Sequence, residues 1–237
     1  MSTPWAASTS RKIERALKPQ ANPVFASGMK AYLKDQFEFL GVKTPERRSA
    51  VRAILKADPP QNKQDVIELV DILWHKKYRE YVHSACDVLA LYNSFFDAKD
   101  LKVTIHDWVI TNPWWDSVDS LGSVVISPIA RREPQALETM WKWLEDSNMW
   151  LNRAAIGYQR GFKTETDLAV VYKMCHRYAS DPRFFISKAI GWELRDITAF
   201  NPEFVADFVA NHPDLGNVAR REAIRGLERS KHKSSLK

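Results

Sequence analysis

The 237-residue sequence is poor in cysteine and glycine and contains no long apolar run. Its two cysteines, Cys86 and Cys175, have no further cysteine at metal-ligand spacing, and its histidines form no H-x-x-x-H pair. We therefore expect no metal site and a reducing compartment. Because no apolar run reaches about 18 residues, we expect neither a membrane-spanning helix nor a membrane partner. Only eight glycines among many helix-forming residues count against an all-β fold.

The two ends of the chain differ from the rest in composition. The first ten residues, MSTPWAASTS, lack the apolar core of a secretory signal, and we expect a flexible end there. We expect a single domain over residues 11–230, a basic tail over residues 231–237 and a cytoplasmic location. The net charge of +6 is compatible with binding to nucleic acid, with binding to an anionic membrane surface, or with no such partner.

An internal repeat of about 35 residues organises the chain. The segments WLNRAAIGY (150–158) and FISKAIGWE (185–193) share the order ring, aliphatic, polar, basic, alanine, aliphatic. Steps of 34 to 36 residues lead to four further helical segments, which begin near Pro45, Tyr81, Trp115 and Ala219. Self-similarity at a fixed period of this length is typical of repeat architectures.

Second helical patterns alternate with these segments. They cover residues 66–74, 101–110, 136–144, 167–178 and 202–211, and proline-containing breakers separate the helices. A helix pair recurring at this period predicts an all-α fold, a right-handed α-solenoid of HEAT-like repeats with a concave binding face. Tetratricopeptide repeats have a similar period, but their W-x₂-L-G-x₂-Y signature is not present in register.

Each repeat helix carries two stripes of side chains at helical spacing. The first stripe is apolar and predicts the core; it contains Val82, Cys86, Leu89, Leu151, Ala155, Tyr158, Ile186 and Ile190. The second stripe interleaves rings with cations, a combination suited to a sugar-phosphate backbone and unstacked bases. It contains Tyr81, Trp115, Trp150, Phe185, Trp192, Arg48, Arg153 and Lys188. Asp119 interrupts it at a position that is alanine in every comparable helix from residue 81 onward.

Simpler interpretations exist for these residues. Aromatic rings at helical spacing more often belong to a core than to a binding surface. Asp119 could cap its helix or pair with Arg153, and a charge run such as Lys188 with the C-terminal segment is often only a solvated face. The functional interpretation depends on two tryptophans, one aspartate and one arginine lying on the same stripe.

Four segments resemble the AlkD-type alkylpurine DNA glycosylases, a family of HEAT-like repeat proteins. They are LGVKTPERR (40–48), NPWWDSVDS (112–120), SNMWLNRAAI (147–156) and RFFISKAIGWELRD (183–196), and the similarity runs from about residue 24 to about residue 228. The resemblance implies a catalytic cleft made by Trp115, Asp119 and Trp192, with Arg153 as a supporting basic residue. It also implies DNA contacts by Tyr32, Phe184, Phe185 and Arg195. To these we add Lys43, Arg48, Trp114 and Lys188, which lie in the same segments.

The implied reaction is removal of a cationic N3- or N7-alkylated purine, such as 3-methyladenine or 7-methylguanine, from double-stranded DNA. Tryptophan faces attract a cation, and a carboxylate can stabilise an oxocarbenium and orient water. We expect a monomeric, monofunctional glycosylase of base excision repair that needs no cofactor and does not enclose the base. Lys188 is the residue that would change this, because a lysine can form a Schiff base. The alternative is a basic helical-repeat scaffold that binds DNA or an acidic protein without catalysis.

Overall fold

The computed structural model describes residues 3–234, with side chains up to residue 231. Within these residues the chain is helical, and the one departure is an isolated β-bridge between Glu38 and Tyr78. The all-α prediction is therefore confirmed. The chain divides into two compact units, Met1–Phe96 and Asp97–Lys237, and the single domain over residues 11–230 stays a prediction. In a repeat array each repeat contacts mainly its neighbours.

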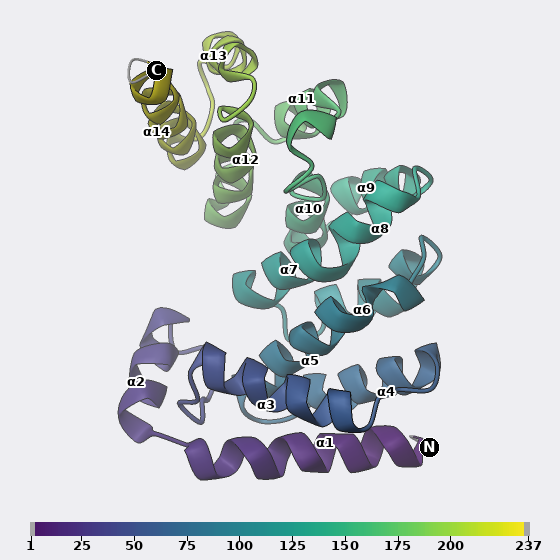
Figure 1. Ribbon diagram of the computed structural model, residues 1–237. Coiled ribbons are helices and arrows are strands. Elements are labelled where there is room, and N and C mark those ends of the chain that lie inside the picture. Colours follow the sequence, from purple (N-terminus) through teal and green to yellow (C-terminus); the bar gives the residue numbers. More distant parts are fainter. Residues whose placement is uncertain (1–2, 235–237) are drawn as a thin grey trace. The chain divides into compact units, whose positions relative to one another are not determined.

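The first unit is built from five α-helices. They are α1 (Pro4–Leu17), α2 (Pro23–Tyr32), α3 (Thr44–Ala57), α4 (Lys63–Trp74) and α5 (Arg79–Tyr92). Helix α1 packs against α3 and α4, and α4 packs against α5 (Figure 1). Helix α2 has no buried residue, so it contributes surface rather than core.

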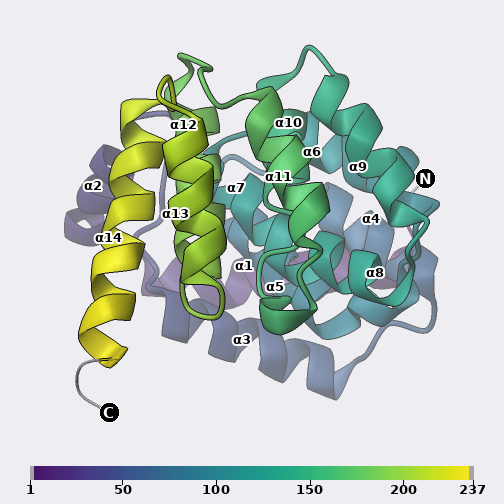
Figure 2. The same ribbon diagram turned by 90° about the horizontal axis from the view of Figure 1, so that it is seen from above.

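The second unit contains the remaining helices. They are α6 (Thr104–Ile110), α7 (Trp115–Leu121), α8 (Ser127–Arg132), α9 (Ala136–Glu145), α10 (Met149–Ile156), α11 (Leu168–Arg177), α12 (Phe184–Ile197), α13 (Pro202–Asn211) and α14 (Asn217–Ser234). Helix α10 packs against α6, α7, α9, α11 and α12, and α12 packs along α14 with α13 beside them (Figure 2). The repeat helices predicted near Trp115, Trp150, Phe185 and Ala219 are α7, α10, α12 and α14.

Local chemistry sets where these helices begin. The side chains of Asn148, Asp167 and Asn201 accept hydrogen bonds from backbone N–H groups in the first turns of α10, α11 and α13. These caps satisfy donors that have no partner inside the helix. Proline occupies the first turn of α13, where its missing N–H costs nothing.

The predicted core stripe is confirmed, because all eight of its residues are buried. Packing between α12 and α14 is especially close at Gly191. A Cβ atom there would lie 2.9 Å from the Cα of Ala219 and 2.9 Å from the Cβ of Glu222. A glycine is therefore required where these two repeat helices touch.

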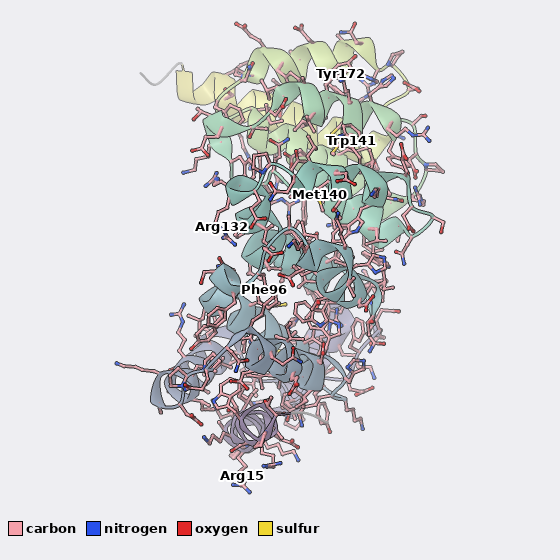
Figure 3. All side chains as sticks on the ribbon, turned by 90° about the vertical axis from the view of Figure 1, so that its right-hand side faces the viewer. Arg15, Phe96, Arg132, Met140, Trp141 and Tyr172 are labelled. Atoms are coloured by element: carbon pink, nitrogen blue, oxygen red, sulfur yellow. The ribbon has the colours of Figure 1, made fainter. Side chains whose placement is uncertain are left out.

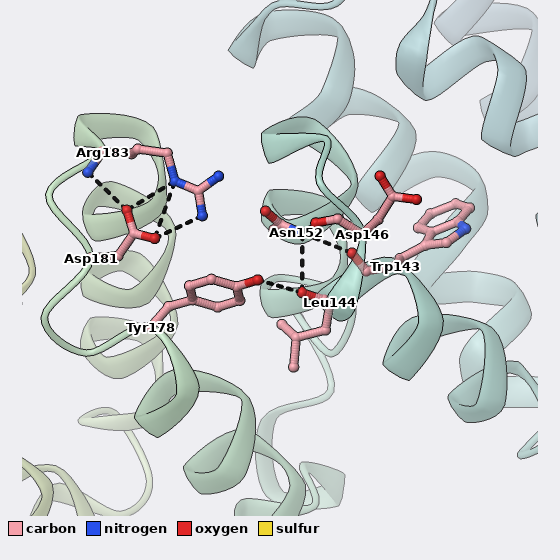
Figure 4. Close-up of polar contacts among 7 residues, drawn as sticks. All are labelled: Trp143, Leu144, Asp146, Asn152, Tyr178, Asp181 and Arg183. Atoms are coloured by element: carbon pink, nitrogen blue, oxygen red, sulfur yellow. Dashed lines mark hydrogen bonds and ion pairs between the residues drawn. The ribbon is translucent and has the colours of Figure 1, made fainter.

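A buried amide joins α10 to the end of α9. The Asn152 Nδ2 donates to the backbone oxygens of Trp143, Leu144 and Asp146 at 2.9, 3.1 and 2.8 Å (Figure 4). Tyr178 adds a hydroxyl hydrogen bond of 2.6 Å to the oxygen of Leu144. Carbonyls at a helix C-terminus have no partner inside the helix, so these side chains tie neighbouring repeats together.

The structure differs from the predictions at both ends of the chain. Residues 4–10 belong to α1 and are not a flexible end; Ala6, Thr9 and Ser10 are buried. The other face of α1 carries charge, and Arg15 points outward in Figure 3. The predicted basic tail begins inside α14, which continues to Ser234, and its last three residues lie outside the described part of the chain.

Across residues 3–234, no helix combines the length and apolar character that crossing a membrane requires.

Candidate functional site

Asp119 and Arg153 form a two-pronged ion pair inside the second unit. The Arg153 Nε donates to Asp119 Oδ1 at 2.8 Å, and Nη2 donates to Oδ2 at 2.7 Å. The Arg153 side chain is 2% exposed, whereas the Asp119 side chain keeps 18% exposed. The pair therefore presents a carboxylate at the surface while its partner is anchored below. Two parallel hydrogen bonds fix the plane of the carboxylate as well as its position.

Two further contacts hold Arg153. Its Nη1 donates to the backbone oxygen of Phe185 at 2.6 Å, and its guanidinium carbon lies 5.4 Å from the centre of the Trp192 ring. Residues from α7, α10 and α12 thus meet at one guanidinium. Three of the four predicted catalytic residues, Asp119, Arg153 and Trp192, are brought together by these contacts.

The fourth, Trp115, begins α7 one turn before Asp119 and is half-buried. Helix α7 passes directly into a π-helical turn, Gly122–Ile126, and then into α8. The Ser123 hydroxyl donates to the backbone oxygen of Asp119 at 3.0 Å. Pro128 follows this turn and has no N–H, which interrupts the α-helical hydrogen-bond ladder. Turns of this kind are frequent at functional sites, and nothing in the sequence pattern predicted this one.

The Trp192 ring is surrounded by positive charge. The cationic groups of Arg153, Arg160, Lys188 and Arg195 lie 5.4, 5.1, 5.4 and 5.9 Å from its centre. Each lies within the range of a cation–π contact. Arg160 is not among the residues predicted from the sequence, because it follows the end of α10 and falls outside the aligned stripe. Its only sequence signal is that it is basic and two residues after Tyr158.

The depression beside Asp119 is very small. It is lined by residues that include Asp119, Arg153 and Arg160, and its volume is about 10 Å³. Pockets that enclose a drug-sized ligand are roughly 300–1,000 Å³. Within the second unit, the carboxylate therefore lies on an open surface and not inside a cavity that could enclose a purine.

Next to the ion pair is an aromatic cluster. The ring centres of Trp114, Trp150 and Phe185 lie 5.1 to 5.6 Å apart. Trp150 is buried, so for this residue the core interpretation is the correct one. Phe184 packs edge-on against Phe185 and is 57% exposed, so it extends the cluster to the surface.

Two predicted DNA-contacting cations already have an internal partner. Glu222 is buried and accepts from Lys188 at 2.6 Å and from Arg195 at 2.7 Å. Hydrogen bonds from both cations hold the pKa of Glu222 below its usual range. The carboxylate keeps both cations on the exposed side of α12, with side-chain exposures of 24% and 32%.

Three predicted DNA-binding residues belong to the first unit. Tyr32, at the end of α2, is 69% exposed. The Lys43 ammonium lies 4.1 Å from the centre of the Phe25 ring, and the Arg48 Nε is 3.1 Å from an oxygen of Asp87. Both cations remain exposed.

The chain is therefore a helical-repeat protein whose neighbouring helices carry a fixed surface carboxylate, aromatic rings and clustered cations. Cations can contact phosphates, and rings can stack on bases. The family of DNA alkylation repair enzymes matches residues 13–227, nearly the whole chain, and the chain belongs to this family. The resemblance found in the sequence is thereby confirmed.

A solved structure supports the same assignment. It is described as a predicted DNA alkylation repair enzyme from Enterococcus faecalis and is 28% identical to this chain. The similarity covers 86% of this chain and 94% of that one, with a TM-score of 0.79. None of the curated proteins compared with the chain matches it.

Proposed function

We propose that this DNA alkylation repair enzyme is a monofunctional DNA glycosylase. Its reaction is hydrolysis of the bond between deoxyribose and a cationic N3- or N7-alkylated purine in double-stranded DNA. The observation that carries the proposal is the bidentate Asp119–Arg153 pair, which keeps the carboxylate oriented at an open surface. The concave face predicted from the sequence would receive the duplex.

The role of Asp119 follows from the charge of the leaving group. An alkylated purine that is already cationic departs readily, and positive charge then develops on the sugar. Asp119 stabilises this oxocarbenium and orients a water molecule towards C1′. Arg153 is a positioning residue: it keeps the carboxylate in place, and its other hydrogen bond, to Phe185, fixes its own position.

The two tryptophans have different surroundings and therefore different proposed roles. Four cations surround Trp192, which makes its face a poor place for another cation and a good neighbour for phosphates flanking the lesion. We assign contact with the cationic base or sugar to Trp115, which lies one turn from Asp119 on α7. The small volume beside Asp119 supports catalysis without an enclosed base.

Lys188 is not a suitable nucleophile in this arrangement. Its ammonium is held by Glu222 at 2.6 Å, and a charged amine cannot attack C1′. This supports hydrolysis without strand cleavage.

The decisive experiment measures release of 7-methylguanine and 3-methyladenine from alkylated duplex DNA by the purified monomer. Borohydride is added in a parallel reaction to trap any Schiff base. We expect free base, abasic DNA and no trapped complex. A non-catalytic scaffold would bind the duplex and release no base, and a trapped complex would contradict the monofunctional mechanism.

A further inference from the structure

A second, much larger cavity lies in the same unit and shares Arg160 with the depression beside Asp119. Its walls are the segment that follows α10, the C-terminal half of α12 and the last turns of α14, and its volume is about 780 Å³. This size is typical of sites that bind small molecules. Helices α12 and α14, which form two of its walls, run side by side in Figures 1 and 2.

The wall of this cavity is rich in positive charge. Arg160, Lys163, Arg195 and Arg229 all line it, whereas its carboxyl groups are those of Glu193 and Asp196. Asp196 is exposed and Glu193 is 2% exposed. Among the described residues, neither Lys163 nor Arg229 has a carboxylate within ion-pair distance. The cavity therefore has cations available for an anionic ligand.

Two buried polar atoms in the wall lack partners. Neither the Glu193 Oε2 nor the Arg160 Nε has a hydrogen-bond partner in the structure. Buried polar atoms without partners are uncommon in native proteins and need an explanation. A phosphate oxygen in the cavity would accept from the Arg160 Nε, and a water molecule or a ligand hydroxyl would donate to the Glu193 Oε2.

The remaining lining residues fit a nucleotide. Thr164 and Thr166 provide hydroxyl groups, and Phe200 provides a half-buried ring on which a base can stack. Guanidinium groups match the geometry of phosphate oxygens better than that of any neutral ligand.

We propose that this cavity binds a phosphate-bearing nucleotide group, held by Lys163 and Arg229 at its rim and by Arg160 deeper inside. The group has two possible sources, a phosphodiester of bound DNA or a free mononucleotide. The proposal does not depend on the glycosylase reaction, because it concerns binding of a ligand and not release of a base, although Arg160 lines both the cavity and the depression beside Asp119.

The test uses a double variant, Lys163→Ala with Arg229→Ala, in the full-length protein. A matched double variant, Lys173→Ala with Arg221→Ala, removes the same charge from exposed positions of α11 and α14 that do not line the cavity. Binding to an undamaged duplex is measured by fluorescence anisotropy at several salt concentrations. Binding of deoxyadenosine monophosphate is measured by calorimetry, with inorganic phosphate as a second probe.

If the ligand is a DNA phosphate, the cavity variant should show a shallower plot of the logarithm of the duplex association constant against the logarithm of salt concentration. The magnitude of the slope should fall by about 2, because each of the two lost phosphate contacts contributes about 0.9. If it is a free nucleotide, deoxyadenosine monophosphate affinity should fall at least tenfold while duplex binding is retained. The control variant should keep the wild-type values in both assays. A cavity variant that matches its control in both assays overturns the proposal. Neither assay measures base release. The glycosylase proposal is therefore tested independently, by the release of 7-methylguanine and 3-methyladenine described above.

Discussion

Arg153 holds both carboxylate oxygens of Asp119, at 2.8 and 2.7 Å, across the contact between α10 and α7. The arginine is almost completely buried, while the aspartate remains partly exposed. Burying a charged group costs desolvation free energy, and the partly exposed carboxylate of Asp119 avoids part of that cost. The exposed carboxylate is therefore the feature that the first two predictions test.

Replacement of Asp119 by asparagine should remove catalysis and retain the fold. Asp119→Asn keeps the shape of the side chain but loses the charge that stabilises the oxocarbenium, a loss of roughly 3–4 kcal/mol or about 10²–10³ in rate. Single-turnover excision of 7-methylguanine measures this effect, and a melting curve measures stability. Asp181→Asn is the matched control, because Asp181 forms a similar pair with Arg183 in the same unit (Figure 4). Near-normal excision by a stable Asp119→Asn protein would remove the catalytic role.

Replacement of Arg153 by lysine should separate charge from orientation. A lysine keeps the positive charge but cannot make two parallel hydrogen bonds to Asp119 and a third to Phe185. We expect excision to slow by at least tenfold and stability to fall by about 1–3 kcal/mol, as for other broken buried hydrogen bonds. Affinity for undamaged duplex should change little, since Arg153 is too buried to reach a phosphate. Excision at the wild-type rate would show that the orientation of Asp119 does not matter.

Replacement of Arg195 by alanine should weaken DNA binding without changing its selectivity. Phosphate contacts carry no information about the base, so damaged and undamaged duplexes should lose affinity by the same factor. Glu222 would keep its contact with Lys188 at 2.6 Å, which limits the structural effect. Anisotropy titrations with both duplexes provide the measurement. A loss confined to the damaged duplex would instead assign Arg195 to recognition of the lesion.

The buried Glu193 should make stability fall as the pH rises. Burial raises the pKa of Glu193 to about 7 from 4.5; Arg160 opposes this shift and Asp196 adds to it. Between pH 4.5 and 7 the folded protein therefore keeps a proton on Glu193 that the unfolded chain has released. Ionising the buried carboxyl group lowers the free energy of unfolding, and this loss is absent below pH 4.5 and complete above pH 7. The difference corresponds to about 3 kcal/mol.

Glu193→Gln tests this directly, because glutamine stays neutral at every pH. The variant and the wild type should be similarly stable at pH 5, and the variant should be more stable at pH 8. Urea unfolding across this range gives the difference curve, from which carboxylates common to both proteins cancel. Parallel curves for the two proteins would show that Glu193 ionises normally.

Much of the fold follows from spacing in the sequence. The period of about 35 residues located the repeat helices that become α7, α10, α12 and α14, and the apolar stripe identified core residues such as Leu151 and Ile190. Both depend on local geometry, because the period of a helix decides which residues share a face. Helix α1 was not predicted, because its formation depends on tertiary packing and not on local spacing. Its run of Ser8, Thr9 and Ser10 consists of weak helix formers, and packing against α3 and α4 stabilises the helix.

The sequence by itself determined which residues stand on the second stripe: Asp119, Arg153 and Trp192 could all be selected from their offsets and from the family resemblance. Only the tertiary structure decided what each of them contacts. In the structure Trp150 is buried in the core, and Arg160 lies beside Trp192. Lys188 and Arg195 both pair with Glu222. The physical reason is that helical periodicity sets the direction of a side chain about its own helix. The partner it meets depends on how neighbouring repeats pack, which is a property of contacts between residues about 35 positions apart.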